Sequence, residues 1–128
     1  MTRQTVRSDQ APRAIGPYSQ AVRHGSLLFL SGQIPLDPQT GDIVSSDIEA
    51  QTHRVMKNLG AILAQAGASF EQVVKTTIYL VDLGEFDAMN QAYASYFSDK
   101  PPARATVQVA ALPKKARVEI DAIAIVGD

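Results

Sequence analysis

The chain contains no cysteine. This excludes a disulfide framework, a thiolate nucleophile and a cysteine-based metal site, and it fits a reducing compartment. With 128 residues, 45% of them hydrophobic, the chain can still fill one ordinary core. We therefore expect a single domain over residues 1–128.

Long hydrophobic runs are also missing. The longest, at residues 122–127, is far shorter than the roughly 20 residues that span a bilayer. Residues 1–14 are polar and lack the apolar segment of a signal peptide. We expect a soluble cytoplasmic protein that does not enter a membrane.

Neither sign of charge predominates, and the net charge is −1 at pH 7. Proteins that bind nucleic acids gather lysine and arginine against the phosphates. The densest basic cluster here is Lys114, Lys115 and Arg117, which we interpret as a solvated turn. We therefore do not expect a nucleic-acid partner.

Motifs of cofactor and metal sites are absent from the sequence. It has no glycine-rich nucleotide loop and no Gly-x-Ser-x-Gly elbow. His24 and His53 lie far apart, and neither has metal-ligand spacing to another histidine or carboxylate. We expect no metal and no cofactor.

The first half of the chain predicts a hairpin and a helix. Residues 20–24 and 27–31 have strand character around a turn at Gly25, and the apolar run at 27–30 suggests cover on both faces. Residues 37–42 form a turn by composition. The following helix, at 47–66, is predicted to begin at a capping box of Ser46 and Glu49 and to end at Gly67.

The second half predicts strands at 73–81, 104–109 and 117–126, with a helix at 84–97 before the proline pair 101–102. The predicted element order is β-β-α-β-α-β-β. A further short strand is possible before these elements, near residues 3–7. Strand–helix–strand connections require parallel or mixed pairing. We therefore predict an α+β two-layer sandwich with a mixed sheet.

Three charged residues break the strand patterns. Glu119 and Asp121 share a strand face with apolar residues, where a carboxylate is costly unless it is paired or hydrogen-bonded. The alternative is an edge strand whose first residues are exposed to solvent. Arg104 shares a face with Thr106 and Gln108 and offers a planar fork for a carboxylate, although an ordinary surface ion pair would also place it there.

Gly16-Pro17 predicts a sharp bend that holds Tyr18 just before the hairpin, either as a pocket wall or as a core aromatic. The segments that carry a family resemblance are 14–21, 30–35, 58–59, 74–80, 89–90, 102–109, 112–113 and 118–122. In these segments, which follow in order over nearly the whole chain, the sequence resembles the Rid family, also called YjgF-like.

The resemblance implies a chorismate-mutase-like fold, with a six-stranded sheet and two helices on one face. It also implies a homotrimer with active sites between subunits. The implied reaction is the hydrolysis of reactive 2-imino and 2-enamino acids, such as 2-aminoacrylate and 2-aminocrotonate, to 2-keto acids and ammonia. Such an imine is already electrophilic, so no cofactor is needed.

By the same resemblance, Arg104 would hold the substrate carboxylate and Glu119 would direct water. The other matched positions would line the pocket: Tyr18, Ser31, Gly32, Asn90 and Thr106. Some family members carry cysteine where Thr106 stands, so cysteine-dependent activity does not transfer to this chain. Two alternatives stay open, namely a non-catalytic trimer that binds keto acids, and a ribonuclease or translation inhibitor.

Overall fold

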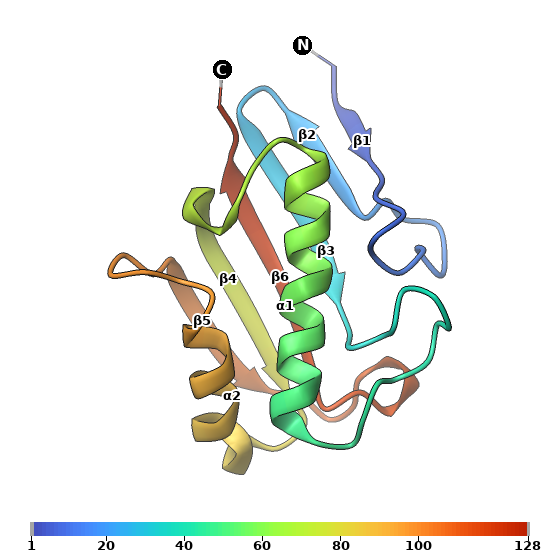
Figure 1. Cartoon of the computed structure of the whole chain (residues 1–128), viewed down its shortest axis with the longest axis vertical. Helices are drawn as coiled ribbons and strands as arrows, with labels where there is room; N and C mark the ends of the chain where they lie inside the picture. The colour runs from blue at the N-terminus through green and yellow to red at the C-terminus, as the bar shows by residue number, and fades with distance from the viewer. Residues whose placement is uncertain (1, 128) are drawn as a thin grey trace.

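The computed structural model describes residues 2–127, which form one six-stranded sheet with two α-helices on one of its faces (Figure 1). This confirms the predicted α+β class, and the short N-terminal strand is present. The strands are β1 (Gln4–Val6), β2 (Ala21–His24), β3 (Leu27–Gln33), β4 (Val73–Leu80), β5 (Ala103–Gln108) and β6 (Val118–Ile125). The helices are α1 (Ile48–Gln65) and α2 (Phe86–Ala94).

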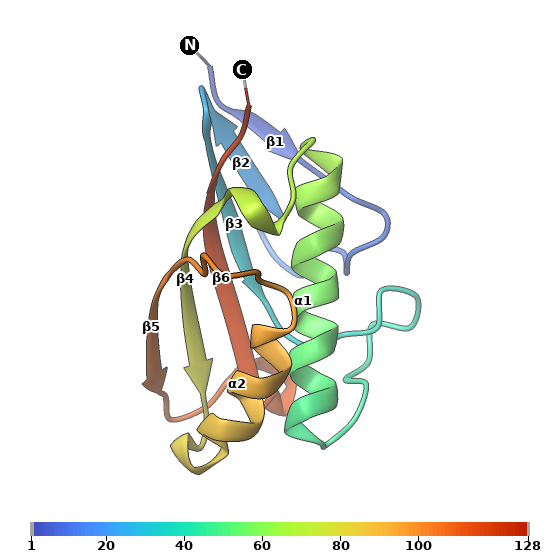
Figure 2. The same ribbon diagram turned by 60° about the vertical axis from the view of Figure 1, so that its left-hand side comes forward.

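The sheet is mixed, with the strand order β1-β2-β3-β6-β4-β5. Only β4 and β5 pair in parallel, and the other neighbours are antiparallel. A parallel pair needs a crossover connection, which α2 supplies. Figure 2 shows both helices on the same side of the sheet, so the other face carries no helix.

The start of α1 differs from the prediction. Asp47, not Ser46, is the N-cap, and its carboxylate accepts a hydrogen bond of 2.9 Å from the backbone N–H of Ala50. The predicted capping box of Ser46 and Glu49 is therefore wrong, because the aspartate one residue later satisfies the open N–H group. The predicted end is confirmed, since Gly67 follows the helix with a φ of 78°.

The second helix is shorter than the predicted 84–97. A 3-10 turn at Leu83–Glu85 precedes α2, and the Asp82 carboxylate accepts a hydrogen bond from Gly84 N there. At the other end the Ser95 hydroxyl donates to the carbonyl of Ala92 at 2.7 Å, a local bond that competes with helix continuation. Within residues 2–127, neither helix is long and apolar enough to cross a membrane.

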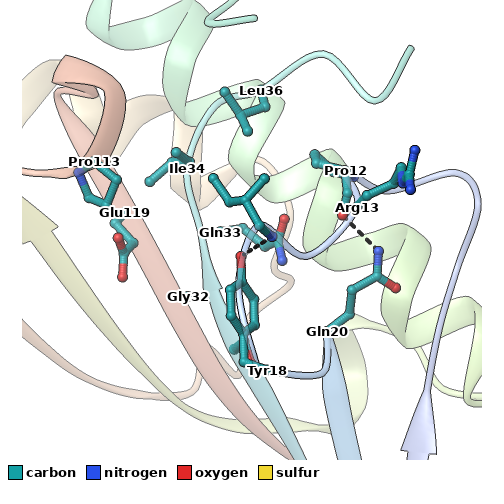
Figure 3. Close-up of a pocket in the computed structure, with 12 residues that line it drawn as sticks. Pro12, Arg13, Tyr18, Gln20, Gly32, Gln33, Ile34, Leu36, Pro113 and Glu119 are labelled. Atoms are coloured by element: carbon teal, nitrogen blue, oxygen red, sulfur yellow. Dashed lines mark hydrogen bonds between the residues drawn. The ribbon is translucent and has the colours of Figure 1, made fainter. Parts of the chain in front are cut away.

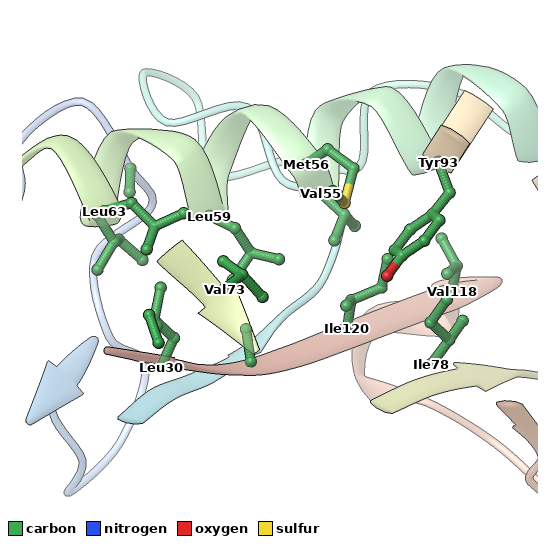
Figure 4. Packing of buried hydrophobic residues seen from close by; sticks show 14 of the residues in the cluster. Leu30, Val55, Met56, Leu59, Leu63, Val73, Ile78, Tyr93, Val118 and Ile120 are labelled. Carbon is green, nitrogen blue, oxygen red and sulfur yellow. The ribbon is translucent and has the colours of Figure 1, made fainter. Parts of the chain in front are cut away.

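The core lies between α1, α2 and the helix-covered face of the sheet. Figure 4 shows leucine, valine and methionine side chains of α1 above β3, β4 and β6, with Tyr93 of α2 over the other end. Each large apolar side chain buried there contributes roughly 1.5–3 kcal/mol to stability. Fully buried members include Leu28, Val55, Met56, Ile62, Leu63, Ile78, Val118 and Ile120.

The opposite face of the sheet is open in the single chain. Leu28 and Leu30 are buried under the helices, but Phe29 between them is 45% exposed. The prediction that residues 27–30 are covered on both faces is therefore not met within one chain. The exposed large apolar side chains of this open face include Leu27, Phe29, Val107 and Ile125.

Candidate active site

Glu119 lies near the start of β6, on the open face, where the pairing of β3 with β6 is irregular. Leu30 is opposite Ala122, but Gln33 is opposite Ile120, so β3 holds one residue more than β6 in this stretch. Such a bulge bends a strand and is frequent beside active sites. Here it opens a cavity of about 410 Å³, into which Glu119 reaches from β6 (Figure 3).

Four of the seven predicted site residues line this cavity: Tyr18, Ser31, Gly32 and Glu119. The bulge brings the backbone of Gly32 against the Glu119 carboxyl group. A Cβ atom at position 32 would lie 2.9 Å from Cδ and 3.1 Å from Cγ of Glu119. Any side chain there would displace the carboxylate. The glycine therefore serves to place Glu119, a more specific role than the pocket lining that the resemblance implied for it.

Tyr18 is held by the bend that the sequence predicted. Gly16 has a φ of 139°, which favours glycine, and its carbonyl accepts a hydrogen bond from Tyr18 N at 2.9 Å. The Tyr18 hydroxyl in turn accepts from the backbone N–H of Ile15 at 3.2 Å. The ring is 46% exposed, so it is a wall of the cavity and not a core aromatic.

Hydrogen bonds of Ser31 and Gln20 hold the segment between β1 and β2 in place. The Ser31 hydroxyl donates to the carbonyl of Ser19 at 2.6 Å. The buried side chain of Gln20 donates to the carbonyl of Pro12 at 2.7 Å and accepts from Ser8 N at 2.6 Å. Sequence reasoning missed Gln20, because a glutamine next to a strand gives no sign that it crosslinks a distant loop.

The electrostatics of the cavity favour a proton-accepting role for Glu119. Burial raises the pKa of its carboxyl group above the ordinary value, and the negative charge of Asp121 raises it further. A base with a pKa nearer neutrality can both take up and return a proton. Tyr79, another residue that the sequence did not single out, donates from its hydroxyl to Asp121 Oδ2 at 2.9 Å.

Arg104 and Asn90 form a second group at the far edge of the sheet. Arg104 Nη1 donates to Asn90 Oδ1 at 2.7 Å. The guanidinium carbon lies 5.4 Å from the ring centre of Phe86 and 5.2 Å from that of Tyr93, in the range of cation–π contacts. Both rings belong to α2. Together they hold the guanidinium group beside a depression of about 340 Å³.

No carboxylate within residues 2–127 forms an ion pair with Arg104. The alternative interpretation as an ordinary surface pair therefore does not hold for the described part of the chain. Thr106 lies on the same face of β5 as Arg104. The hydroxyl oxygen of Thr106 is buried and has no hydrogen-bond partner among the described residues. Leaving such a group unpaired costs about 1–3 kcal/mol. A cation and an unpaired hydroxyl thus lie on one strand.

Arg104 and Glu119 do not meet within one chain. Arg104 pairs with Thr76 and lies on the helix side of the sheet, whereas Glu119 pairs with Tyr79 on the open side. Strand β4 stands between their two strands. The seven predicted residues thus form two groups, one around Glu119 and one with Arg104, Asn90 and Thr106.

Among residues 2–127, no three histidine or carboxylate side chains are grouped so that they could hold a metal ion. The Nδ1 atom of His53, for example, forms a hydrogen bond of 2.8 Å with the Tyr96 hydroxyl. The polar groups that the two clusters present are the Glu119 carboxylate, the Arg104 guanidinium and the Thr106 hydroxyl.

Comparisons with known proteins agree with this fold over almost the whole chain. Residues 8–126 match the family described as endoribonuclease L-PSP. The Myxococcus xanthus protein DfrA is 58% identical over 127 residues, which cover 98% of this chain and 97% of that protein. The human 2-iminobutanoate/2-iminopropanoate deaminase is 46% identical over 127 residues, covering 99% of this chain and 93% of that protein.

Solved structures give the same result. RidA from the Antarctic bacterium Psychrobacter superposes with a TM-score of 0.93 at 43% identity, covering 96% of this chain and 99% of that one. Escherichia coli TdcF, solved with bound serine, superposes with a TM-score of 0.92 at 41% identity, covering 97% and 99%. The chain therefore belongs to the Rid family.

Proposed function

We propose that this protein hydrolyses short 2-imino acids to 2-keto acids and ammonia, at a site that two subunits of a homotrimer form together. The observation that carries the proposal is the pair of complementary groups. A ring-stacked guanidinium without an ion-pair partner in residues 2–127 suits the substrate carboxylate. A half-buried carboxylate with a raised pKa suits the activation of water.

The reaction needs only proton transfers around an electrophilic carbon. Glu119 takes a proton from water as the oxygen bonds to the imine carbon, which gives a tetrahedral carbinolamine. The same carboxyl group returns the proton to nitrogen. It then relays the hydroxyl proton to that nitrogen as the C–N bond breaks, so that ammonia leaves and the hydroxyl oxygen becomes the keto oxygen. A positioned acid–base group of this kind contributes about 10²–10⁴-fold to a rate.

The arrangement of the two groups supports sharing of the site between subunits. A small 2-imino acid cannot reach Arg104 and Glu119 of one chain, because they face opposite sides of the sheet. The open face also exposes Phe29 and Ile125, whose cover by a second copy would remove apolar area from water. The deaminase names of the human and mouse relatives, at 46% and 47% identity, agree with the proposed chemistry.

The ribonuclease activity that the family description names fits this chain less well. RNA cleavage requires an acid–base pair beside cations that bind phosphate. Of the basic cluster singled out in the sequence, Arg117 is already paired with Glu85 at 2.7 Å. Lys114 donates to the carbonyl of Gly41 at 3.2 Å.

The test is a coupled assay in which a serine dehydratase generates 2-aminoacrylate and the appearance of pyruvate is followed. The proposal predicts that catalytic amounts of the wild-type protein accelerate pyruvate release over buffer. It also predicts a mass in solution of three chains of 13.8 kDa. No acceleration with short or long imino acids would contradict the enzymatic function and favour a trimer that only binds keto acids.

A further inference from the structure

On the open face of the sheet, Glu119, Asp121 and Tyr79 form a continuous polar group. On β6, Glu119 and Asp121 are two residues apart and therefore point to the same side. On β4, Tyr79 lies directly opposite Glu119. The Tyr79 side chain crosses diagonally, and its hydroxyl donates to Asp121 Oδ2 at 2.9 Å.

This geometry places Tyr79 and Asp121 next to the carboxylate without giving either a contact with the cavity. The residues that line the cavity include Glu119 but neither Tyr79 nor Asp121. Directly opposite residues on antiparallel strands have Cβ atoms about 4.5–5.5 Å apart, and diagonal neighbours lie within reach of long side chains. Asp121 therefore acts on Glu119 through its charge, and Tyr79 acts on Asp121 through the hydrogen bond.

Other charged and titratable groups face Glu119 and Asp121 from the neighbouring elements. On β4, Thr77 lies directly opposite Asp121, and Lys75 lies two residues away on the same face, opposite Ile123. The segment before β2 contributes Arg13 and Tyr18 to the cavity wall, and the turn before β6 contributes Pro113, followed by two lysines. The bulged part of β3 contributes only uncharged residues. Beside burial, Asp121 is the group whose charge raises the pKa of Glu119.

We propose that Asp121 and Tyr79 are a positioning pair that sets how readily Glu119 takes up and returns the proton of the attacking water. Hydrolysis of an imine uses one carboxyl group as base and then as acid, so its proton affinity must suit both steps. The Asp121 charge strengthens Glu119 as a base. The Tyr79 hydroxyl limits this effect by donating to Asp121. The role in turnover rests on the proposed deaminase function, whereas the effect on Glu119 does not.

The test compares Asp121→Asn and Tyr79→Phe with the wild-type protein by two measurements. The first is a ¹³C NMR titration of the glutamate carboxyl groups, four in this chain, with Glu119 assigned from a Glu119→Gln spectrum. The second is the pH profile of kcat/KM in the coupled assay. Glu71→Gln is the control, because it removes one negative charge beside the opposite end of β4.

In Asp121→Asn, Glu119 is expected to titrate at lower pH, and the acid limb of the profile is expected to move in the same direction. The plateau kcat should fall by about two- to five-fold with KM unchanged, because a weaker base drives proton transfer less well. Tyr79→Phe should move both curves to higher pH, because Asp121 loses its donor. Glu71→Gln should move neither.

An Asp121→Asn titration or pH profile that coincides with the wild-type curve would overturn the positioning role. A change confined to KM would do the same, because it would indicate contact with the substrate. If the wild-type protein fails to deaminate, the proposed function fails, but the NMR titration still decides whether the pair acts on Glu119. If Asp121→Asn does not fold, the same two measurements on Tyr79→Phe test the positioning role, and curves that coincide with those of the wild-type protein would overturn it.

Discussion

Replacing Arg104 with alanine is expected to lower kcat/KM for 2-imino acids by at least about 100-fold, as two charge-assisted hydrogen bonds of roughly 1.5–3 kcal/mol each are lost. The guanidinium group is held by Asn90 at 2.7 Å and by two aromatic rings. Its side-chain freedom is thus restricted before the substrate arrives. The measurement is the coupled assay with 2-aminoacrylate.

Two further variants define the origin of this loss. Arg104→Lys keeps the charge but not the planar fork, so we expect an intermediate loss of about tenfold. Arg3→Ala removes an arginine from the exposed N-terminal segment and should leave the rate unchanged. If Arg104→Ala keeps the wild-type rate, Arg104 does not bind the substrate carboxylate.

Replacing Glu119 with glutamine is expected to lower kcat by about 10²–10³-fold, within the range for loss of a general acid–base group. The side-chain volume is nearly unchanged, so binding of 2-keto acids should persist. Calorimetric titration with 2-ketobutyrate, together with the coupled assay, separates the two effects. A protein that only binds keto acids would show no important change in either measurement.

The pH dependence of the wild-type enzyme has a defined sign. Glu119 accepts a proton only as a carboxylate, and both burial and Asp121 raise its pKa. Activity should therefore fall as the pH decreases through that raised pKa, and Glu119→Gln should lack this limb. A glutamine variant that retains the wild-type kcat and acid limb would show that another group activates water.

Much of the fold was predictable from periodicity. The alternation along β6 correctly separated the buried residues from the face that carries Glu119 and Asp121. The exact start of α1 was not predictable, because Ser45, Ser46 and Asp47 are all competent caps and only the three-dimensional turn selects among them. The length of α2 likewise depends on a local bond of Ser95 that has no clear sequence signal.

The candidate site was predictable as a set of residues but not as a geometry. A period of two tells which residues share a strand face, yet it does not give the order of strands in the sheet. The position of β4 between β5 and β6, which separates Arg104 from Glu119, therefore emerged only from the structure. The same is true of Gly32 against Glu119 and of Tyr79 beside Asp121, since both contacts join strands that are distant in sequence.

Mixing the two inactive variants tests most directly whether deamination occurs at a site shared between subunits. Arg104→Ala and Glu119→Gln chains would be unfolded together in equal amounts, refolded and assayed with 2-aminoacrylate. If each site takes Arg104 from one subunit and Glu119 from its neighbour, about a quarter of the sites in randomly mixed trimers are intact, and activity should return to about that fraction. Activity that stays at the level of the separate variants would contradict the shared site.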